Sequence, residues 1–400
     1  MRGANLRPNV LQLVSSFHQG GSERQALQLT RLLKQSGRHT MHLACMDKSG
    51  TLLDEVKRLG FGDIPEYPLT SFYDRNALVQ VRRFALHLQR LGVDIVQTHD
   101  FYTNIFGMAA APLAGVRVRI AARRETTGWR TPAQKVVERQ AYRFAHAVVA
   151  NSEAVRRQLI TEGVAERKIV TLHNGIDLAR LGVPPSFDRT EALASFGLPA
   201  EPQLRFVTIL ANLRHAVKDH PTFLRAASRV RAAFPAARFV LAGEGELSGA
   251  MREMAAQLGL ADETFFIGRA ERVAELLAAS DICVLSSRAE GFSNSILEYM
   301  AASRPVVVTD VGGAREAVVD GETGYVVPAG ADEAMAARIT ALLEQPERAR
   351  AMGERGRAVV EQRFSCAAQL AATESLYERL LEASAQRRAS RMASVRREVM

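Results

Sequence analysis

Short apolar runs alternating with amphipathic helical stretches constrain the fold of this chain more than any other feature. In the first half, Asn9–Ser15, His39–Met46 and Asp94–Thr98 are apolar over the length of a strand and lead into segments with helical spacing. A second series of the same kind begins at Arg205–Leu210 and continues through Pro305–Thr309. Such alternation is typical of parallel sheets covered by helices on both faces. The sequence therefore predicts an α/β chain with two doubly wound domains.

The length and the placement of prolines set the expected domain boundaries. At 400 residues, the chain is too long for one ordinary core. Prolines punctuate a polar stretch at about 178–203, which indicates a linker. The expected parts are an N-terminal domain at 1–180, a linker at 181–203, a C-terminal domain at 204–365, a helix packing back on the first domain at 366–385, and a basic tail at 386–400.

Composition narrows the class of protein. Apolar residues make up 47% and charged residues 24%, which is typical of a soluble globular chain. No apolar run approaches the roughly 20 residues that span a bilayer, and Val10–Val14 is too short for a signal peptide. We therefore expect a cytoplasmic protein. The three cysteines are too few and too scattered for a disulfide framework or a metal site.

The formal charge of +9 is unevenly distributed. Eight cations against two glutamates occupy Arg117–Arg143, and basic faces of this kind attract phosphate-bearing partners. Residues 386–400 add five arginines, for which a solvated tail and a partner-binding tail are equally compatible readings.

Two glycine-containing turns follow expected strands. Gly20 and Gly21 enter a helix, where a phosphate could approach the backbone amides, although the same glycines suit a simple tight turn. Leu241–Glu246 approaches a dinucleotide fingerprint, but its glycine spacing is one residue too long. Glu244 and Glu246 would also place negative charge beside a pyrophosphate, so an NAD site is excluded there.

Arg214 and Lys218 follow the first strand of the second domain. Two cations at the carboxyl end of a strand suit a departing diphosphate, because they stabilise the charge that grows as the sugar–phosphate bond breaks. The alternative is a capped turn with solvated basic side chains.

The segment Ser286–Ala301 is the most informative. Glu290 precedes a glycine turn, a helix is expected to start near Ser293 or Asn294, and Glu298 lies about one turn into that helix. Free amides at the helix start can hold phosphate, and the two carboxylates can accept hydrogen bonds from sugar hydroxyls. The alternative is a pair of solvated carboxylates on a surface turn.

This segment resembles the E-x7-E signature of the retaining glycosyltransferases of family 4. The resemblance covers roughly residues 9–380 and implies the GT-B architecture, with two Rossmann-like domains facing across a cleft and C-terminal helices crossing back. Further matching landmarks are Gly20–Arg24, His173–Asp177, Arg304–Gly313 with Glu316, and Asp320–Pro328.

The resemblance implies a role for each matching residue on the donor side. Glu290 would contact the donor sugar and Glu298 the ribose. Arg214 and Lys218 would bind the diphosphate, although the arginine sits one position later than in the commoner pattern. The remaining donor-side expectations are Gly20, Gly21, Gly291, Phe292 and Ser293 at the phosphates, Arg269 at the nucleotide base, and Asn294 among the residues that bind the donor sugar or nucleotide.

The acceptor side departs from the family pattern. Many members carry a histidine after the fifth strand of the first domain, but Arg123–Gly128 contains none. Either Arg124 or Glu125 takes over a positioning role, or this loop is built differently. His99 ends the preceding strand and is expected to face the cleft, where a lone histidine can be structural or catalytic.

The resemblance thus implies a retaining transferase that moves a sugar from a nucleotide-diphosphate donor to a glycan or a lipid-linked acceptor, as in polysaccharide assembly. No cofactor or metal is expected, because Arg214 and Lys218 supply the positive charge. The basic stretch predicts an anionic, lipid-linked acceptor at the inner face of the membrane.

Other readings remain open at this point. A sugar-nucleotide epimerase or a phosphorylase could use the same scaffold, although no lysine is marked for pyridoxal phosphate. An inactive scaffold protein is a further alternative. Nucleic-acid binding is suggested by charge alone, and the chain has no recognition motif for it; we therefore expect no nucleic-acid partner.

Overall fold

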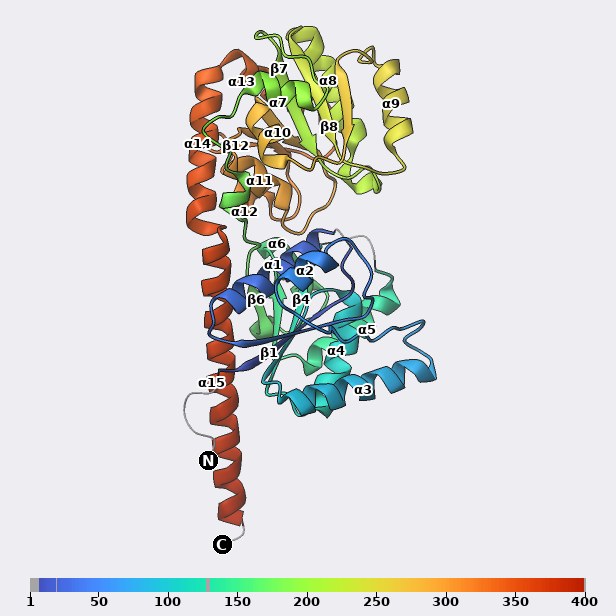
Figure 1. Ribbon diagram of the computed structural model, residues 1–400, viewed down its shortest axis with the longest axis vertical. Helices are drawn as coiled ribbons and strands as arrows, with labels where there is room; N and C mark the ends of the chain where they lie inside the picture. The colour runs from blue at the N-terminus through green and yellow to red at the C-terminus, as the bar shows by residue number, and fades with distance from the viewer. Residues whose placement is uncertain (1–6, 19, 127–129, 399–400) are drawn as a thin grey trace. The chain divides into compact units, whose positions relative to one another are not determined.

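The computed structural model describes residues 7–18, 20–126 and 130–398. The chain divides into two compact units (Figure 1). Unit 1 comprises residues 1–124, 128–174 and 367–400, and unit 2 comprises 125–127 and 175–366, each within the described ranges. Each unit is built on one six-stranded parallel sheet, which confirms the predicted α/β class with two Rossmann-like domains.

The sheet of unit 1 has the strand order β2-β1-β3-β4-β5-β6. Strand β1, next to the edge strand β2, pairs in parallel on both sides, with Val10 opposite Met41 on β2 and Ile95 on β3. Most residues of the central strands are buried on both faces, which explains their continuous apolar runs. The strands are β1 (Asn9–Val14), β2 (Thr40–Cys45), β3 (Ile95–Thr98), β4 (Val118–Arg123), β5 (Ala147–Ala150) and β6 (Ile169–Thr171).

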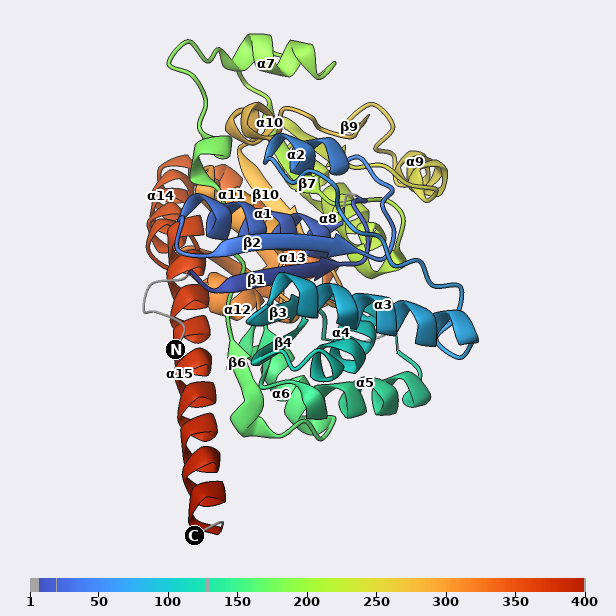
Figure 2. The same ribbon diagram turned by 60° about the horizontal axis from the view of Figure 1, so that its bottom comes forward.

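Helices cover both faces of this sheet. Helices α3, α4 and α5 lie in one row, with α4 in contact with both neighbours (Figure 2). Side chains of α1 and α15 form a separate core with β1, β3, β4 and β5. Asp74, Thr131 and Ser152 start α3, α5 and α6 by accepting backbone amide hydrogens. The helices are α1 (Gly21–Gln35), α2 (Leu53–Arg58), α3 (Arg75–Leu91), α4 (Phe101–Leu113), α5 (Pro132–Phe144), α6 (Glu153–Thr161), η1 (Glu166–Lys168) and α15 (Cys366–Glu398).

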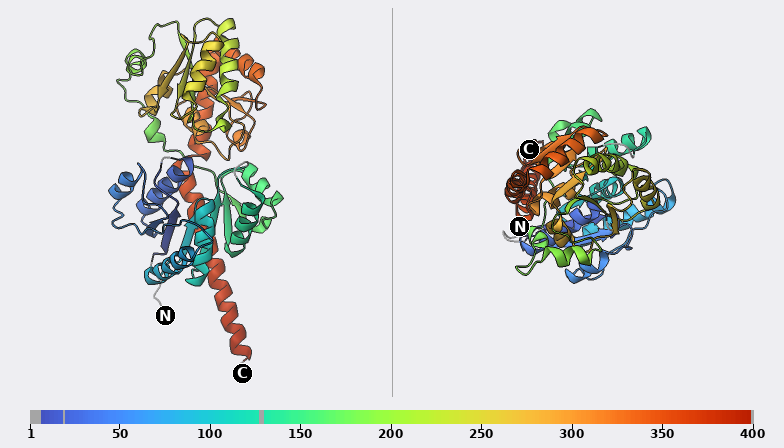
Figure 3. Two further views of the ribbon diagram at one scale, coloured as in Figure 1. Left: turned by 90° about the vertical axis from the view of Figure 1, so that its right-hand side faces the viewer. Right: turned by 90° about the horizontal axis from the view of Figure 1, so that it is seen from above.

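Helix α15 ties the C-terminal segment to the sheet of unit 1. The Tyr377 hydroxyl is completely buried, donates to the side-chain oxygen of Gln97 and accepts from the amide of Gln12 at 2.9 Å. The helix continues through the region expected to form a tail, and its last turns extend past the sheet (Figure 3). The side chains of Arg391, Arg396 and Arg397 lie outside the described residues, whereas Arg387 and Arg388 are exposed.

The sheet of unit 2 has the order β12-β11-β10-β7-β8-β9, and all of its pairs are parallel. Its strands are β7 (Arg205–Leu210), β8 (Ala237–Ala242), β9 (Thr264–Gly268), β10 (Ile282–Leu285), β11 (Val306–Thr309) and β12 (Gly324–Val327). Its helices are η2 (Leu178–Leu181), α7 (Arg189–Ser195), η3 (Ala216–Lys218), α8 (His220–Ala233), α9 (Ser248–Gln257), α10 (Val273–Ala279), α11 (Asn294–Ala301), α12 (Ala314–Ala317), α13 (Asp332–Glu344) and α14 (Pro346–Arg363).

Residues 181–203 do not form the expected linker. They contain α7, which Asp188 caps by accepting the amide of Glu191 at 2.8 Å. Leu193 is buried in one cluster with Phe206 of β7, so the segment is part of unit 2. The prolines of this segment therefore mark turns within unit 2 and not a boundary between two units.

The remaining composition-based expectations concern cysteines, metals and membranes. Cys45 and Cys283 are buried free thiols, and burial raises the pKa of Cys45 to about 12. Among the described residues, no cluster of three or more histidines, cysteines or carboxylates could hold a metal ion. None of the described helices has the length and apolar character needed to cross a bilayer.

Candidate active site

The carboxyl edge of the unit 2 sheet gathers the predicted donor-side residues. Lys218 follows β7, Glu290 follows β10 and Arg269 follows β9. Because β7 lies between β10 and β8 in a parallel sheet, the loops after these strands emerge at the same edge. The topology therefore places these segments, far apart in sequence, around one site.

Lys218 and Glu290 form the centre of this site. The Lys218 ammonium lies 2.6 Å from Glu290 Oε1, which also accepts a hydrogen bond from the Ser287 hydroxyl at 2.7 Å. The side chains are 21% and 14% exposed, so the pair is shielded yet reachable from solvent. A charge-assisted hydrogen bond of this kind holds both groups in one geometry. A cation for phosphate and a carboxylate for hydroxyl groups thus stand side by side.

A second ion pair supports the loop that carries Lys218. Asp219 is buried, adopts a left-handed conformation with φ 47°, and accepts from Thr222 Oγ1 at 2.8 Å. Arg288 donates to Asp219 Oδ2 at 2.9 Å, and the Ser286 hydroxyl donates to the Lys218 carbonyl at 2.9 Å. The loops after β7 and β10 are therefore fastened together. Sequence reasoning missed Asp219, whose only signal was its place before a proline-containing helix start.

Gly312 lets a third loop pack against Glu290. Its φ is +55°, and a Cβ atom there would lie 2.2 Å from the Glu290 carbonyl oxygen. The Gly313 amide donates to the Gly291 carbonyl at 2.8 Å. The double glycine after β11 thus positions the turn that carries Glu290.

Helix α11 begins next to this turn. Ser293 is its N-cap residue, and its side chain makes no capping hydrogen bond. Phe292 is buried and packs against Phe364 with ring centroids 5.2 Å apart, so its side chain is part of the core of unit 2. Asn294 and Glu298 are half-buried on the first and second turns of the helix.

Hydrogen bonds anchor α11 to the end of β7. The Ser295 hydroxyl donates to the Leu210 carbonyl at 2.9 Å, and the Leu210 amide donates to the Tyr299 hydroxyl oxygen at 2.7 Å. Burial raises the pKa of Tyr299 well above its usual value. The helix that carries Glu298 is thereby fixed relative to the loop that carries Lys218.

The other predicted cations of unit 2 lie at the same edge without joining the central pair. Arg214 is exposed, and its guanidinium makes no ion pair with a carboxylate of the described chain. Its backbone is held by Gly245, where a Cβ atom would lie 2.4 Å from the Arg214 amide nitrogen. Arg269 is exposed directly after β9. Both side chains are available to a ligand that spans the edge.

In unit 1, the glycine turn precedes α1, which begins at Gly21 with Gly20 as its N-cap residue. Gln19 of this turn lies outside the described residues. A Cβ atom at Gly20 would be 2.1 Å from Glu23 Oε2, so the Glu23 carboxylate lies against the helix start. A phosphate could approach these amides only after this carboxylate moves away.

His99 belongs to a buried hydrogen-bond network. Its Nε2 lies 2.6 Å from Gln12 Oε1, and Gln12 in turn bonds to Tyr377 of α15. Burial and the nearby Arg124 guanidinium lower the pKa of His99 well below its usual value, so the ring is neutral. A neutral ring that donates to Gln12 favours the structural reading of this histidine.

The other two residues predicted on the acceptor side, Arg124 and Glu125, belong to different units. The Arg124 guanidinium donates to Asn174 Oδ1 at 2.7 Å and reaches His99 Nδ1 at 3.5 Å, so it belongs to the same network. Glu125 groups with unit 2, and positions 127 and 128 of this loop lie outside the described residues.

Much of the basic stretch Arg117–Arg143 is neutralised internally. Arg123 is 2% exposed and pairs with Glu162, and Glu138, 1% exposed, pairs with Arg130 at 2.9 Å. The Tyr142 hydroxyl donates to Glu138 at 2.7 Å. Further ion pairs join Lys135 to Glu162 at 3.3 Å and Arg117 to Asp94 at 3.2 Å. The clustering of cations in the sequence of Arg117–Arg143 therefore overstates the positive charge that this segment presents in the folded protein.

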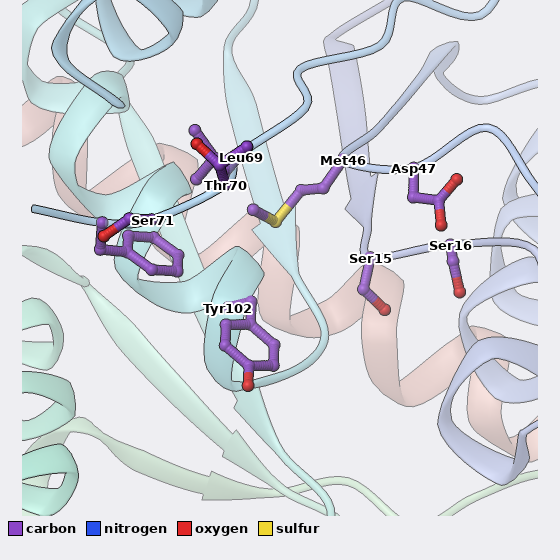
Figure 4. A pocket seen from close by; sticks show the side chains of 9 residues that line it. Ser15, Ser16, Met46, Asp47, Leu69, Thr70, Ser71 and Tyr102 are labelled. Atoms are coloured by element: carbon purple, nitrogen blue, oxygen red, sulfur yellow. The ribbon is translucent and has the colours of Figure 1, made fainter. Parts of the chain in front are cut away.

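A pocket of about 340 Å³ lies at the carboxyl ends of β1 and β2 and the start of α4 (Figure 4). Phe72 and Tyr102 are stacked there, with ring centroids 6.0 Å apart. Asp47 and several hydroxyl side chains supply polar groups. Aromatic faces beside hydroxyls and a carboxylate suit a ligand rich in hydroxyl groups. The lining residues are Ser15, Ser16, Met46, Asp47, Leu69, Thr70, Ser71, Phe72 and Tyr102.

A pH dependence of stability follows from His220, which is buried at the start of α8 directly after Asp219. Burial lowers its pKa to about 4. In the unfolded chain, the pKa of this histidine is 6.5. Between pH 6.5 and pH 4 the unfolded chain therefore binds a proton that the native chain does not, so the free energy of unfolding falls as pH falls. We expect a loss of roughly 3 kcal/mol at pH 4 from this group. Denaturant titrations between pH 7 and pH 4 should show a shallower decline for His220→Gln, and an unchanged slope would contradict the assignment.

Comparison with known proteins agrees with this fold. Residues 19–180 match the family model of glycosyltransferase family 4, and residues 193–359 match that of the group 1 glycosyl transferases. The chain is 30% identical to the putative glycosyltransferase EpsF of Bacillus subtilis over 311 residues, which cover 75% of this chain and 79% of EpsF. The chain belongs to the glycosyltransferases of GT-B fold.

Two further comparisons describe the extent of similarity. The putative glycosyltransferase EpsD of B. subtilis is 36% identical over 140 residues, which cover 35% of this chain and only 37% of EpsD. The crystal structure of HepE from Anabaena in complex with UDP superposes with a TM-score of 0.81 at 20% identity, covering 92% of this chain and 99% of HepE. This glycosyltransferase thus shares the GT-B fold of HepE over nearly its whole length.

Proposed function

We propose that this glycosyltransferase moves a sugar from a nucleotide-diphosphate donor to an acceptor, with retention of configuration at the anomeric carbon. The pairing of Lys218 with Glu290 beside the start of α11 carries the proposal. The Lys218 ammonium would move to the leaving phosphate, and Glu290 would accept hydrogen bonds from the donor sugar. HepE, a structural neighbour, has been crystallised with UDP-glucose, which supports a donor of this class.

The other residues of the edge complete the proposed donor site. Glu298 would bind the ribose, Arg269 would lie by the base, and Arg214 would share the diphosphate with Lys218. The amides of residues 291–294 would hold phosphate oxygens at the positive end of α11. The amides at Gly20 and Gly21 would bind phosphate oxygens once Glu23 has moved from the start of α1.

For the chemical step, we propose transfer on the same face of the sugar. The bond from the anomeric carbon to the phosphate oxygen breaks as the acceptor oxygen approaches, and the departing phosphate takes the acceptor proton. Lys218 and Arg214 stabilise the charge that develops on the diphosphate, so the mechanism needs no divalent cation. Glu290 would contact the sugar hydroxyls and would not lie below the anomeric carbon, where a covalent nucleophile would be required.

We propose a glycan or a lipid-linked glycan as acceptor, in polysaccharide or exopolysaccharide assembly at the cytoplasmic face of the membrane. The pocket beside Phe72 and Tyr102 supports this choice, because stacked aromatic side chains and hydroxyls suit a sugar ring. His99 and Arg124 would have a structural role in unit 1 through their hydrogen bonds and would not act on the acceptor directly.

Product stereochemistry tests the proposal. NMR of the purified product should show the same anomeric configuration as the donor sugar, since both bonds involve one face of the ring. An inverted anomeric centre would contradict the mechanism. Conversion of the nucleotide sugar to an isomer without any acceptor would instead identify an epimerase.

A further inference from the structure

Exposed apolar side chains concentrate on one layer of unit 1, the row formed by α3, α4 and α5. Of the eleven large apolar side chains that are exposed among the described residues, nine lie on or beside these three helices. The other two, Val183 and Val319, lie in unit 2. The nine are Tyr73, Leu78, Val79, Leu86, Tyr102, Leu113, Val136, Val137 and Phe144.

The charges on the same layer have almost one sign. Helices α3, α4 and α5 carry seven lysines and arginines and one acidic residue, Glu138, which is buried. Arg75, Arg82, Arg90 and Arg143 are exposed and make no ion pair with any carboxylate of the described chain. In contrast to Arg123 and Arg130, these guanidinium groups therefore remain available to an external anion.

Apolar and basic side chains alternate along the outer face of α3. Arg75, Val79, Arg82, Leu86 and Arg90 follow one another at spacings of three or four residues, so they form one stripe along the helix. All five are exposed, and the opposite face of α3 packs on the sheet. We call these five residues the α3 stripe.

The composition of the α3 stripe selects among possible partners. A nucleic acid would neutralise the arginines but would leave Val79 and Leu86 in water, because a phosphate backbone offers no apolar surface. An anionic bilayer satisfies both kinds of side chain, since its phosphates meet the guanidinium groups while the apolar side chains enter the acyl boundary. We propose that the layer of α3, α4 and α5, with the α3 stripe at its centre, docks on an anionic lipid surface.

The position of the sugar-sized pocket agrees with this docking mode. Phe72 and Tyr102 line the pocket, and Tyr73, 91% exposed, lies in sequence between Phe72 and the first turn of α3. A bilayer against the start of α3 would thus lie close to residues that line the pocket. The link between this pocket and the acceptor rests on the proposed function, whereas docking on lipid does not depend on that function.

Vesicle co-sedimentation tests the inference. The full chain should bind vesicles of phosphatidylcholine with 30% phosphatidylglycerol, bind pure phosphatidylcholine weakly, and release at high salt. The triple variant Arg75→Gln/Arg82→Gln/Arg90→Gln should lose affinity at least about tenfold, as should Val79→Ser/Leu86→Ser. The matched control, Arg348→Gln/Arg355→Gln/Arg363→Gln on α14, removes the same charge from unit 2 and should bind normally.

Several results would overturn the inference. These are equal loss of affinity in the α14 control, unchanged binding in both α3 variants, loss of binding only on removal of residues 388–400, and preference for a DNA duplex over vesicles. Thermal unfolding of each variant checks that the fold is kept. Transfer to a water-soluble acceptor should be unchanged in the α3 variants; its absence in the wild-type chain, with vesicle binding intact, would count against the proposed function alone.

Discussion

Replacing Lys218 by methionine is expected to lower kcat about 100- to 1,000-fold with the fold intact. Methionine keeps the length of the side chain but removes the ammonium that lies 2.6 Å from Glu290 and would stabilise the leaving diphosphate. Loss of one preorganised group facing developing charge has an effect of this order. The rate of nucleoside diphosphate release at saturating donor measures it.

The same substitution elsewhere provides the control for this prediction. Lys57→Met removes an exposed lysine of unit 1, paired with Asp54 at 3.3 Å, and should leave kcat unchanged. Glu290→Gln should lower kcat as well, because the amide cannot hold the ammonium by charge. If Lys218→Met retained kcat within about threefold, the diphosphate role assigned to Lys218 would be wrong.

The largest expected effect on stability comes from Arg123→Met. The Arg123 guanidinium is buried between the carboxylates of Glu162 and Glu138, and the variant would leave negative charge in a shielded site. Removing one partner from a buried ion pair costs about 3–5 kcal/mol. Denaturant unfolding followed by circular dichroism should show this loss, whereas kcat per folded molecule should change little.

Arg157→Met is the matched control, because this arginine is exposed on α6 and makes no ion pair among the described residues. Its effect should stay within about 0.5 kcal/mol. A loss of activity in Arg123→Met without a loss of stability would instead assign Arg123, the last residue of β4, a part in the reaction.

The predictions for Lys218 and Arg123 rest on contacts of two kinds, of which the sequence could indicate the first and not the second. The alternation of apolar strands and amphipathic helices predicted both sheets, because buried parallel strands must be apolar along their whole length. The pairing of Lys218 with Glu290, 72 positions apart, was within reach, since both follow strands of one parallel sheet and therefore emerge at one edge.

The partners of buried polar groups could not be predicted in this way. His99 bonds to Gln12, 87 positions away, and Arg123 to Glu162, 39 positions away. Nothing in the local pattern marks either partner, because these contacts depend on side-chain packing between neighbouring elements. The prediction of a linker at 181–203 was wrong for a related reason. Helix α7 is short, and only its burial against β7 reveals that this segment is part of unit 2.

Titration of the protein with a panel of nucleotide-diphosphate sugars, followed by calorimetry, tests the central claim most directly. The wild-type chain should bind at least one of them at one site per chain. Lys218→Met should bind that ligand at least about tenfold more weakly, while its affinity for the free nucleoside stays the same. Failure of every nucleotide sugar to bind, or equal binding by Lys218→Met, would contradict a donor site at the carboxyl edge of unit 2.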